Sequence, residues 1–167
     1  MRRLSALLIC LAAGILIPRV SAADFSWSGN FVQDDEKRLF YFTVSQPGTV
    51  TVRTWSYAGG LNAAGTQVPR GGFDPTLSLY SSTGDLIASN QDGGCSAVAS
   101  DAVTSSCWDA LLTVQLPAGD YRVVLTQSDN TPNGPGLADS FVFEGQGNFT
   151  PAPGSAAAGT RTCRTAW

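Results

Sequence analysis

Six residues with side-chain oxygen atoms are the strongest candidates for chemistry in this chain. Ca²⁺ binds about six to eight oxygen atoms from carboxylates, amide carbonyls, backbone carbonyls and water. Five aspartates and one asparagine occur in or beside segments that lack hydrophobic periodicity, which are expected to be loops. The sequence therefore predicts a calcium site whose ligands are Asp34, Asp35, Asp74, Asn90, Asp92 and Asp109.

The same six residues also fit a simpler role, because Asp and Asn are common in turns and loops. The sequence contains no EF-hand loop and no glycine-aspartate repeat. Carboxylates gathered in one place without a cation would repel one another, which raises their pKa values. A calcium site and ordinary loop residues are therefore both open at this point.

Four aromatic residues close to the same segments are candidates for ligand contact. An exposed ring can stack on a sugar or grip a peptide, whereas a buried ring covers the core beneath the loops. Trp and Tyr are often largely buried in folded proteins. The residues of this possible ligand platform are Trp55, Tyr57, Phe73 and Trp108.

Short segments with alternating apolar and polar residues are expected to position these side chains. Val50 and Val52 alternate with threonine and arginine, which is the pattern of a half-buried strand. Residues 38–44 are apolar on both faces, which favours a central strand. These patterns over residues 24–149 therefore predict an all-β domain, which is an antiparallel β-sandwich with a jelly-roll-like arrangement. About eight strands are expected, at residues 25–32, 38–44, 49–55, 75–80, 86–89, 110–116, 120–127 and 139–149.

The connections between these strands differ in length, and their order separates the long ones from the short ones. Successive antiparallel strands run in opposite directions, so their connections alternate between two ends of the domain. One end receives only tight turns, at residues 46–48, 82–85 and 117–119. The other end receives the long loops, at residues 33–37, 57–74, 90–109 and 128–139. Long loops on a rigid scaffold often carry function, so we expect the ligand site at this second end.

The two ends of the chain have compositions of their own. Residues 1–23 combine a basic start, an apolar stretch and small residues, which predicts a signal peptide and export to the periplasm or the extracellular space. Its removal leaves seven basic against 13 acidic residues, a net charge of about −6, which argues against a nucleic-acid partner. No later segment predicts a transmembrane helix. Residues 150–167 lack periodicity and are expected to form a disordered tail.

Three cysteines stay in the exported chain. Cys95 and Cys107 fall in one predicted loop, and we expect them to form a disulfide, which an exported protein can keep. A loop of this size adds roughly 2.5–3 kcal/mol of stability in the chain-entropy model. Cys163 is left over in the tail as a free thiol, an intermolecular link or a residue without a role.

Three stretches of the sequence resemble a known family. They are LFYFTVSQPGTVTVRTWSYAGG at residues 39–60, GGFDPTLSLYSSTGDLIASNQDGG at 71–94 and DALLTVQLPAGDYRVVLTQ at 109–127. Together they resemble the bacterial pre-peptidase C-terminal domain, a secreted jelly-roll-like β-sandwich related to bacterial collagen-binding domains. The likeness extends over residues 24–149. It is closest to an uncharacterised exported group that often carries a PEP-CTERM sorting tail, from which the final residues GTRTCRTAW depart.

The resemblance implies a non-catalytic module, and some members of the family bind calcium through loop carboxylates. The positions that match those loops are the first acidic loop Asp34-Asp35-Glu36, then Asp74, Asn90, Asp92 and Asp109.

Function is expected to be binding and not catalysis. The chain contains no histidine, which excludes Ser-His-Asp and Cys-His catalysis and histidine-bound zinc. We expect a calcium-stabilised module that binds a protein or a polysaccharide at its long-loop end, as a monomer or with weak self-association. One alternative is a structural component of the cell surface or extracellular matrix that associates through strand edges or Cys163. Another is a small glycoside-acting enzyme that uses two carboxylates, such as Asp74 and Asp92.

Overall fold

The computed structural model describes residues 24–150, 161–163 and 165–166 of the chain. The predicted signal peptide at residues 1–23 lies outside the described residues. Within them, every regular element except the short 3₁₀ helix η1 (Leu137–Asp139) is a β-strand. All strand pairs are antiparallel, so the predicted all-β antiparallel fold is confirmed.

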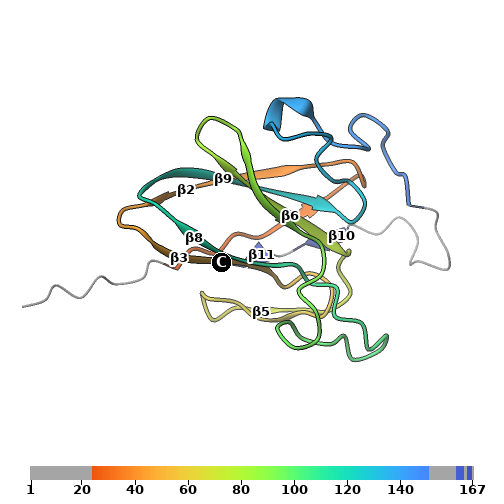
Figure 1. Ribbon diagram of the computed structural model, residues 1–167. Helices are drawn as coiled ribbons and strands as arrows, with labels where there is room; N and C mark the ends of the chain where they lie inside the picture. The colour runs from red at the N-terminus through yellow and green to blue at the C-terminus, as the bar shows by residue number, and fades with distance from the viewer. Residues whose placement is uncertain (1–23, 151–160, 164, 167) are drawn as a thin grey trace, which may run out of the picture.

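Most strands belong to two sheets, which lie one above the other in Figure 1. The four-stranded sheet contains, in spatial order, β2 (Arg38–Val44), β9 (Gly119–Gln127), β6 (Pro75–Ser81) and β7 (Leu86–Asn90). The three-stranded sheet contains β11 (Thr165–Ala166), β3 (Gly48–Thr54) and β8 (Leu111–Leu116). Two further pairs stand outside both sheets: β1 (Gly29–Phe31) with β10 (Arg161–Cys163), and β4 (Gly60–Leu61) with β5 (Gln67–Val68).

One hydrophobic core fills the space between the two sheets. Val52 and Leu112 come from the three-stranded sheet, Leu77 and Val123 come from the four-stranded sheet, and all four belong to the same buried cluster. Alternate side chains of a strand point to opposite faces, which is why one face of each sheet supplies this cluster. The two layers therefore share a core, as a β-sandwich requires.

A folded two-stranded ribbon connects the sheets. β2 pairs with β9 and β3 pairs with β8, while the short links at residues 45–47 and 117–118 carry the chain from one sheet to the other. The β6–β7 hairpin then completes the four-stranded sheet by pairing with β9. A bent ribbon that passes between two sheets is consistent with the predicted jelly-roll-like arrangement, which stays a prediction.

The loops at residues 33–37, 55–74 and 91–110 lie at one end of the strands, as predicted. Residues 128–139 start there but run back to the 82–85 turn, where the Leu137 N–H donates to the Gly84 carbonyl at 2.7 Å. Arg38 at the start of β2 lies opposite Leu125 near the end of β9, and Pro75 at the start of β6 lies opposite Gln127. The same register places the tight turns at the opposite end of the strands. These two ends are called the long-loop end and the turn end below.

The prediction of a central strand at residues 38–44 is wrong. β2 is an edge strand of the four-stranded sheet, with β9 as its neighbour in that sheet. Its outward-facing Leu39 is covered by a segment that crosses the sheet face, and its outward-facing Tyr41 is 64% exposed. Apolar residues on both faces of the strand therefore reflect a covered face, not a central position.

The prediction of a strand at residues 139–149 is also wrong. These residues begin in η1 and continue in turns, with one isolated bridge between Pro132 and Phe141. Residues 128–147, blue at the top of Figure 1, cross the outer face of the four-stranded sheet. There Phe141 packs against Tyr80 and Val124. The apolar residues of this segment alternate as they would in a strand, but they pack against the face of the sheet.

Residues 150–167, predicted as a disordered tail, lie only partly within the described residues. Residues 161–163 and 165–166 form β10 and β11, which pair with β1 and β3, so the prediction is wrong for them. The predicted first strand at residues 25–32 is shorter in the structure, where β1 covers Gly29–Phe31 and pairs with β10. The side chain of Cys163 lies outside the description, and its role stays a prediction.

Candidate functional site

Two loops form the surface at the long-loop end, residues 55–74 and residues 91–110, and Asp109 fastens one to the other. This side chain is buried. Its Oδ1 accepts hydrogen bonds from the Thr54 hydroxyl at 2.8 Å, the Ser56 N–H at 2.6 Å and the Tyr57 N–H at 3.2 Å. Its Oδ2 accepts one from the Ala58 N–H at 2.9 Å. Four donors contact the carboxylate, so Asp109 holds the two loops together.

An ion pair joins the same two loops. The Arg70 guanidinium donates two hydrogen bonds to the buried carboxylate of Asp101, from Nε at 2.5 Å and from Nη2 at 2.8 Å. The N–H of Thr104 donates to the same carboxylate at 2.8 Å. Arg70 first, and the Thr104 N–H second, hold the pKa of Asp101 well below its usual range. Asp101 therefore stays ionised in neutral solution and keeps the loops together.

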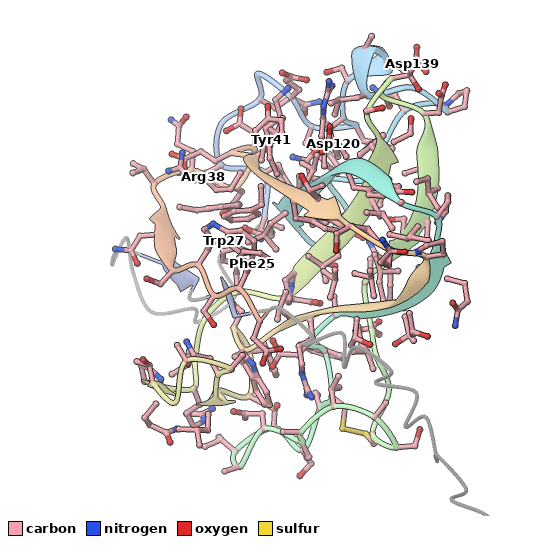
Figure 2. The ribbon with its side chains drawn as sticks, turned by 90° about the vertical axis from the view of Figure 1, so that its left-hand side faces the viewer. Phe25, Trp27, Arg38, Tyr41, Asp120 and Asp139 are labelled. Carbon is pink, nitrogen blue, oxygen red and sulfur yellow. A yellow bond between two sulfur atoms is a disulfide. The ribbon has the colours of Figure 1, made fainter. Side chains whose placement is uncertain are left out.

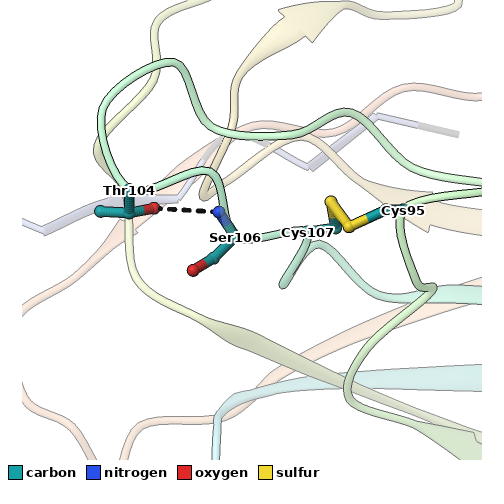
Figure 3. The surroundings of a disulfide bond; sticks show 4 residues. All are labelled: Cys95, Thr104, Ser106 and Cys107. Atoms are coloured by element: carbon teal, nitrogen blue, oxygen red, sulfur yellow. Dashed lines mark hydrogen bonds between the residues drawn. A yellow bond between two sulfur atoms is a disulfide. The ribbon is translucent and has the colours of Figure 1, made fainter.

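The predicted disulfide between Cys95 and Cys107 is confirmed, with an S–S distance of 2.07 Å. Figure 3 shows it beside the hydrogen bond that the Ser106 N–H donates to the Thr104 hydroxyl at 3.3 Å. Gly93 approaches the same loop so closely that a Cβ would lie 2.5 Å from the Val98 Cγ1. Covalent and packing contacts therefore fix a loop that has no regular secondary structure.

Tyr57 and Trp108 form an aromatic pair on these fixed loops. Their ring centroids are 4.7 Å apart and their planes are inclined by 48°. The Tyr57 hydroxyl donates a hydrogen bond to the Thr104 hydroxyl at 3.1 Å, which orients the tyrosine ring. Trp108 is 42% exposed, which is unusual for a tryptophan in a folded domain. We call Tyr57, Thr104 and Trp108 the loop-end surface.

The other two aromatic candidates are not available to a ligand in the same way. Phe73 is buried in the core, where its ring lies 4.7 Å from that of Phe31. The Arg53 guanidinium lies over the half-buried Trp55 ring at 3.8 Å, and a Cβ on Gly60 would lie 2.5 Å from the Trp55 Cε3. Of the four predicted residues, Trp108 is therefore the exposed ring, and the half-buried Tyr57 pairs with it.

Asp74 is the most perturbed acid at the long-loop end. Burial, followed by the charge of Asp92, raises the pKa of Asp74 to about 7, and the charges of Asp129 and Asp109 add to the shift. A hydrogen bond from Ser128 acts in the opposite direction. The Asp74 Oδ1 is buried and accepts no hydrogen bond. This carboxyl group therefore keeps its proton to a higher pH than an ordinary aspartate does.

Asn90 and Asp92 follow β7 and belong to the same end. The Asn90 side chain is occupied by the backbone, since its Oδ1 accepts from the Leu111 N–H at 2.9 Å and its Nδ2 donates to the Asp92 carbonyl at 3.1 Å. Asp92 itself is exposed. Asn90 therefore links β7 to β8, while the Asp92 carboxylate faces solvent.

Asp34 and Asp35 hold a different part of the chain. The buried Asp34 accepts hydrogen bonds from the backbone N–H and the hydroxyl of Thr150. Asp35 accepts one from the Gly147 N–H at 3.0 Å and donates its own N–H to the Gly147 carbonyl at 3.1 Å. These two acids therefore fasten residues 147–150 to the first acidic loop.

The six predicted calcium ligands are thus divided among separate tasks. In the part of the chain that the structure describes, no group of three or more Asp, Glu, Cys or His residues is placed to hold a metal ion. The donor set does not fit one six-residue site, because Asp109 and Asn90 already serve the backbone and Asp34 and Asp35 serve residues 147–150. Asp74 and Asp92 are left as a neighbouring pair.

Sequence reasoning missed the contacts that hold the loop-end surface together. Arg70 and Asp101 are far apart in the sequence, and nothing in their neighbours marks them as partners. It also missed Tyr41 and Asp120, because the wrong position assigned to β2 hid the open face on which they lie. A tyrosine beside polar residues on an edge strand was the available signal.

Among the described residues, no helix combines the length and the apolar character that crossing a membrane requires. Comparisons of the chain with models of protein families, with curated proteins and with solved structures find no match. The likeness to the pre-peptidase C-terminal domain therefore stays a prediction from the sequence.

Proposed function

We propose that the protein is an exported, non-catalytic module that binds a polysaccharide through the loop-end surface. The observation that carries this proposal is the exposed Trp108 ring, paired with Tyr57 on loops that are fixed before any ligand arrives. Aromatic rings bury large areas at little entropic cost when they are already in place. The pair is therefore suited to stack on the apolar face of a sugar ring.

The surroundings of the pair suit a sugar because they combine hydroxyl groups with apolar surface. Thr104 lies next to Tyr57, and the disulfide keeps the loop of Trp108 in position. An acidic protein of this composition is a poor partner for polyanions, so a neutral polysaccharide is favoured. A protein ligand is the competing possibility, because exposed tryptophan and tyrosine are also common in protein interfaces.

Affinity gel electrophoresis with a panel of neutral and acidic soluble polysaccharides tests the proposal. We expect retardation of the native protein by at least one neutral member and a loss of about tenfold in affinity for Trp108→Ala. Val103→Ala is the matched control, since Val103 is 74% exposed on the same loop and outside the aromatic pair. Equal retardation of Trp108→Ala and native protein would remove the loop-end surface from consideration.

Calcium is a separate proposal, and the neighbouring carboxylates of Asp74 and Asp92 carry it. Ionised Asp74 is unfavourable beside Asp92, and a bound cation would relieve this repulsion. Thermal unfolding of chelator-stripped protein at pH 8, with and without added calcium, tests it. An increase in Tm that Asp74→Asn abolishes supports the site. A response that is flat, or that persists in the variant, opposes it.

A further inference from the structure

The outer face of the four-stranded sheet changes character along β2 and β9. Leu39 lies opposite Val124, and residues 128–147 cover this pair. Two residues further along β2, Tyr41 lies opposite Arg122, and then Thr43 lies opposite Asp120. Apolar cross-strand pairs therefore occupy the covered half of the face, and polar or amphipathic pairs occupy the open half toward the turn end.

A groove of about 370 Å³ lies on this open half. The volume is within the range of about 300–1,000 Å³ that small-molecule sites occupy. Figure 2 shows Tyr41 and Asp120 near each other above Phe25 and Trp27. The residues that line the groove are Tyr41, Phe42, Thr43, Ser82, Asp120, Tyr121 and Arg122.

The polar groups of the groove are held in place by contacts within the protein. The Thr43 hydroxyl donates to the Asp120 Oδ1 at 2.6 Å, and the Arg122 Nη2 donates to the Ser82 carbonyl at 2.8 Å. The Arg122 guanidinium also lies 6.0 Å from the centre of the Tyr41 ring. These residues come from paired strands and a tight hairpin, so their spacing is set by strand register and not by a mobile loop.

We propose that this groove is a binding site for a neutral saccharide, separate from the loop-end surface. Tyr41 offers an aromatic ring that is 64% exposed, on which the apolar face of a pyranose can stack. The second carboxylate oxygen of Asp120 can accept from sugar hydroxyl groups, and the remaining N–H groups of Arg122 can donate to sugar oxygens. A pyranose ring combines an apolar face with hydroxyl groups around it, so it matches these three side chains.

The groove contains one carboxylate and one guanidinium, so their effects on a charged ligand oppose each other and neither an acidic nor a basic sugar is favoured. A neutral saccharide can hydrogen-bond to both Asp120 and Arg122 without this conflict. A peptide strand could also approach the edge strand β2. It would depend on backbone groups of β2, however, and would leave the Tyr41–Asp120 arrangement unused.

The test uses the full exported chain and the same panel: a starch-type α-glucan, a mixed-linkage β-glucan, a galactomannan, an arabinoxylan and the acidic polygalacturonate. For a neutral member that retards the native protein, we expect Tyr41→Ala and Asp120→Asn each to lower affinity about tenfold or more. Ile87→Ala is the matched control, because Ile87 is 40% exposed on the opposite edge strand β7. Binding that survives in Trp108→Ala and disappears when Tyr41→Ala is added assigns it to the groove.

The other outcomes separate this inference from the proposed function. Loss in Tyr41→Ala with native binding in Trp108→Ala supports the groove and overturns the loop-end site. Loss in Trp108→Ala with native binding in Tyr41→Ala and Asp120→Asn overturns the groove. Retardation only by polygalacturonate, or by no member of the panel, also overturns it. Tyr41 is exposed, and unchanged Tm values of its variant show that the loss does not come from unfolding.

Discussion

Replacement of Asp74 by Asn is predicted to make the protein more stable above pH 7 and to leave its stability unchanged near pH 4. Burial and the neighbouring Asp92 raise the pKa of Asp74 to about 7, from 3.8. Between these two pH values the folded protein keeps a proton on Asp74 that the unfolded chain releases. Stability therefore falls as pH rises through this window. Asn cannot ionise, so the free energy of unfolding of the variant does not fall in this way as the pH rises.

The size of the effect follows from the shift. A difference of about three pKa units corresponds to about 4 kcal/mol at the limit of full burial. Asp74 is only partly buried, so solvent screening reduces the expected contribution to about 2 kcal/mol. The variant should then exceed the wild type by about this amount in its free energy of unfolding at pH 8, in the absence of calcium.

Urea denaturation at a series of pH values between 4 and 8, in the presence of a chelator, measures this difference. The comparison must use the free energy of unfolding at an unchanged m value, so that effects on the unfolded chain are recognised. Asp92→Asn is the matched control. It removes one neighbouring charge that raises the pKa of Asp74 but keeps Asp74 itself, so the fall in stability should persist but be smaller and end at a lower pH. A difference between Asp74→Asn and wild type that is the same at pH 4 and pH 8 would refute the reasoning.

Three further outcomes follow from the same contacts. Replacement of both Cys95 and Cys107 by Ser should lower the free energy of unfolding by about 3 kcal/mol in urea denaturation, because it reopens the 12-residue separation. Asp109→Ala should cost about 3–5 kcal/mol, since it leaves four buried or half-buried donors without an acceptor, and it should weaken polysaccharide retardation by releasing Tyr57. Native protein should cross-link a long neutral polysaccharide, seen as light scattering, if both proposed sites bind. Trp108→Ala alone should abolish the scattering.

Strand direction was the part of the fold that the sequence determined best. Alternation in β3 and β9 located both strands, and opposite directions of successive strands correctly placed the loops at residues 57–74 and 90–109 at one end, but not residues 128–139, which run back to the 82–85 turn. That inference needs only the count and order of strands between turns. It does not depend on which strands pair, so the wrong position predicted for β2 within its sheet did not affect it.

The sequence could not determine which segments and side chains contact one another in the fold. The alternation around Phe141 is the same whether the segment pairs in a sheet or lies across one, and only the apolar outer face beneath it, with Val124 and Tyr80, decides between them. The acids show the same limit. Asp109 and Asp34 accept hydrogen bonds from backbone N–H groups, which every residue but proline carries, so no residue type marks these contacts in advance.

The distinction between a structural and a ligand-binding acid therefore rests on the donors around each carboxylate. Asp109 has four donors from its own chain, and Asp101 has a guanidinium and backbone N–H groups, so both are satisfied before a ligand arrives. Asp74 has a buried oxygen without a donor, and Asp120 has one hydroxyl on one oxygen. A carboxylate oxygen that still lacks a hydrogen-bond donor after folding can bind a cation or accept a hydrogen bond from a sugar hydroxyl. It makes Asp74 the residue to test for calcium and Asp120 the residue to test for a saccharide.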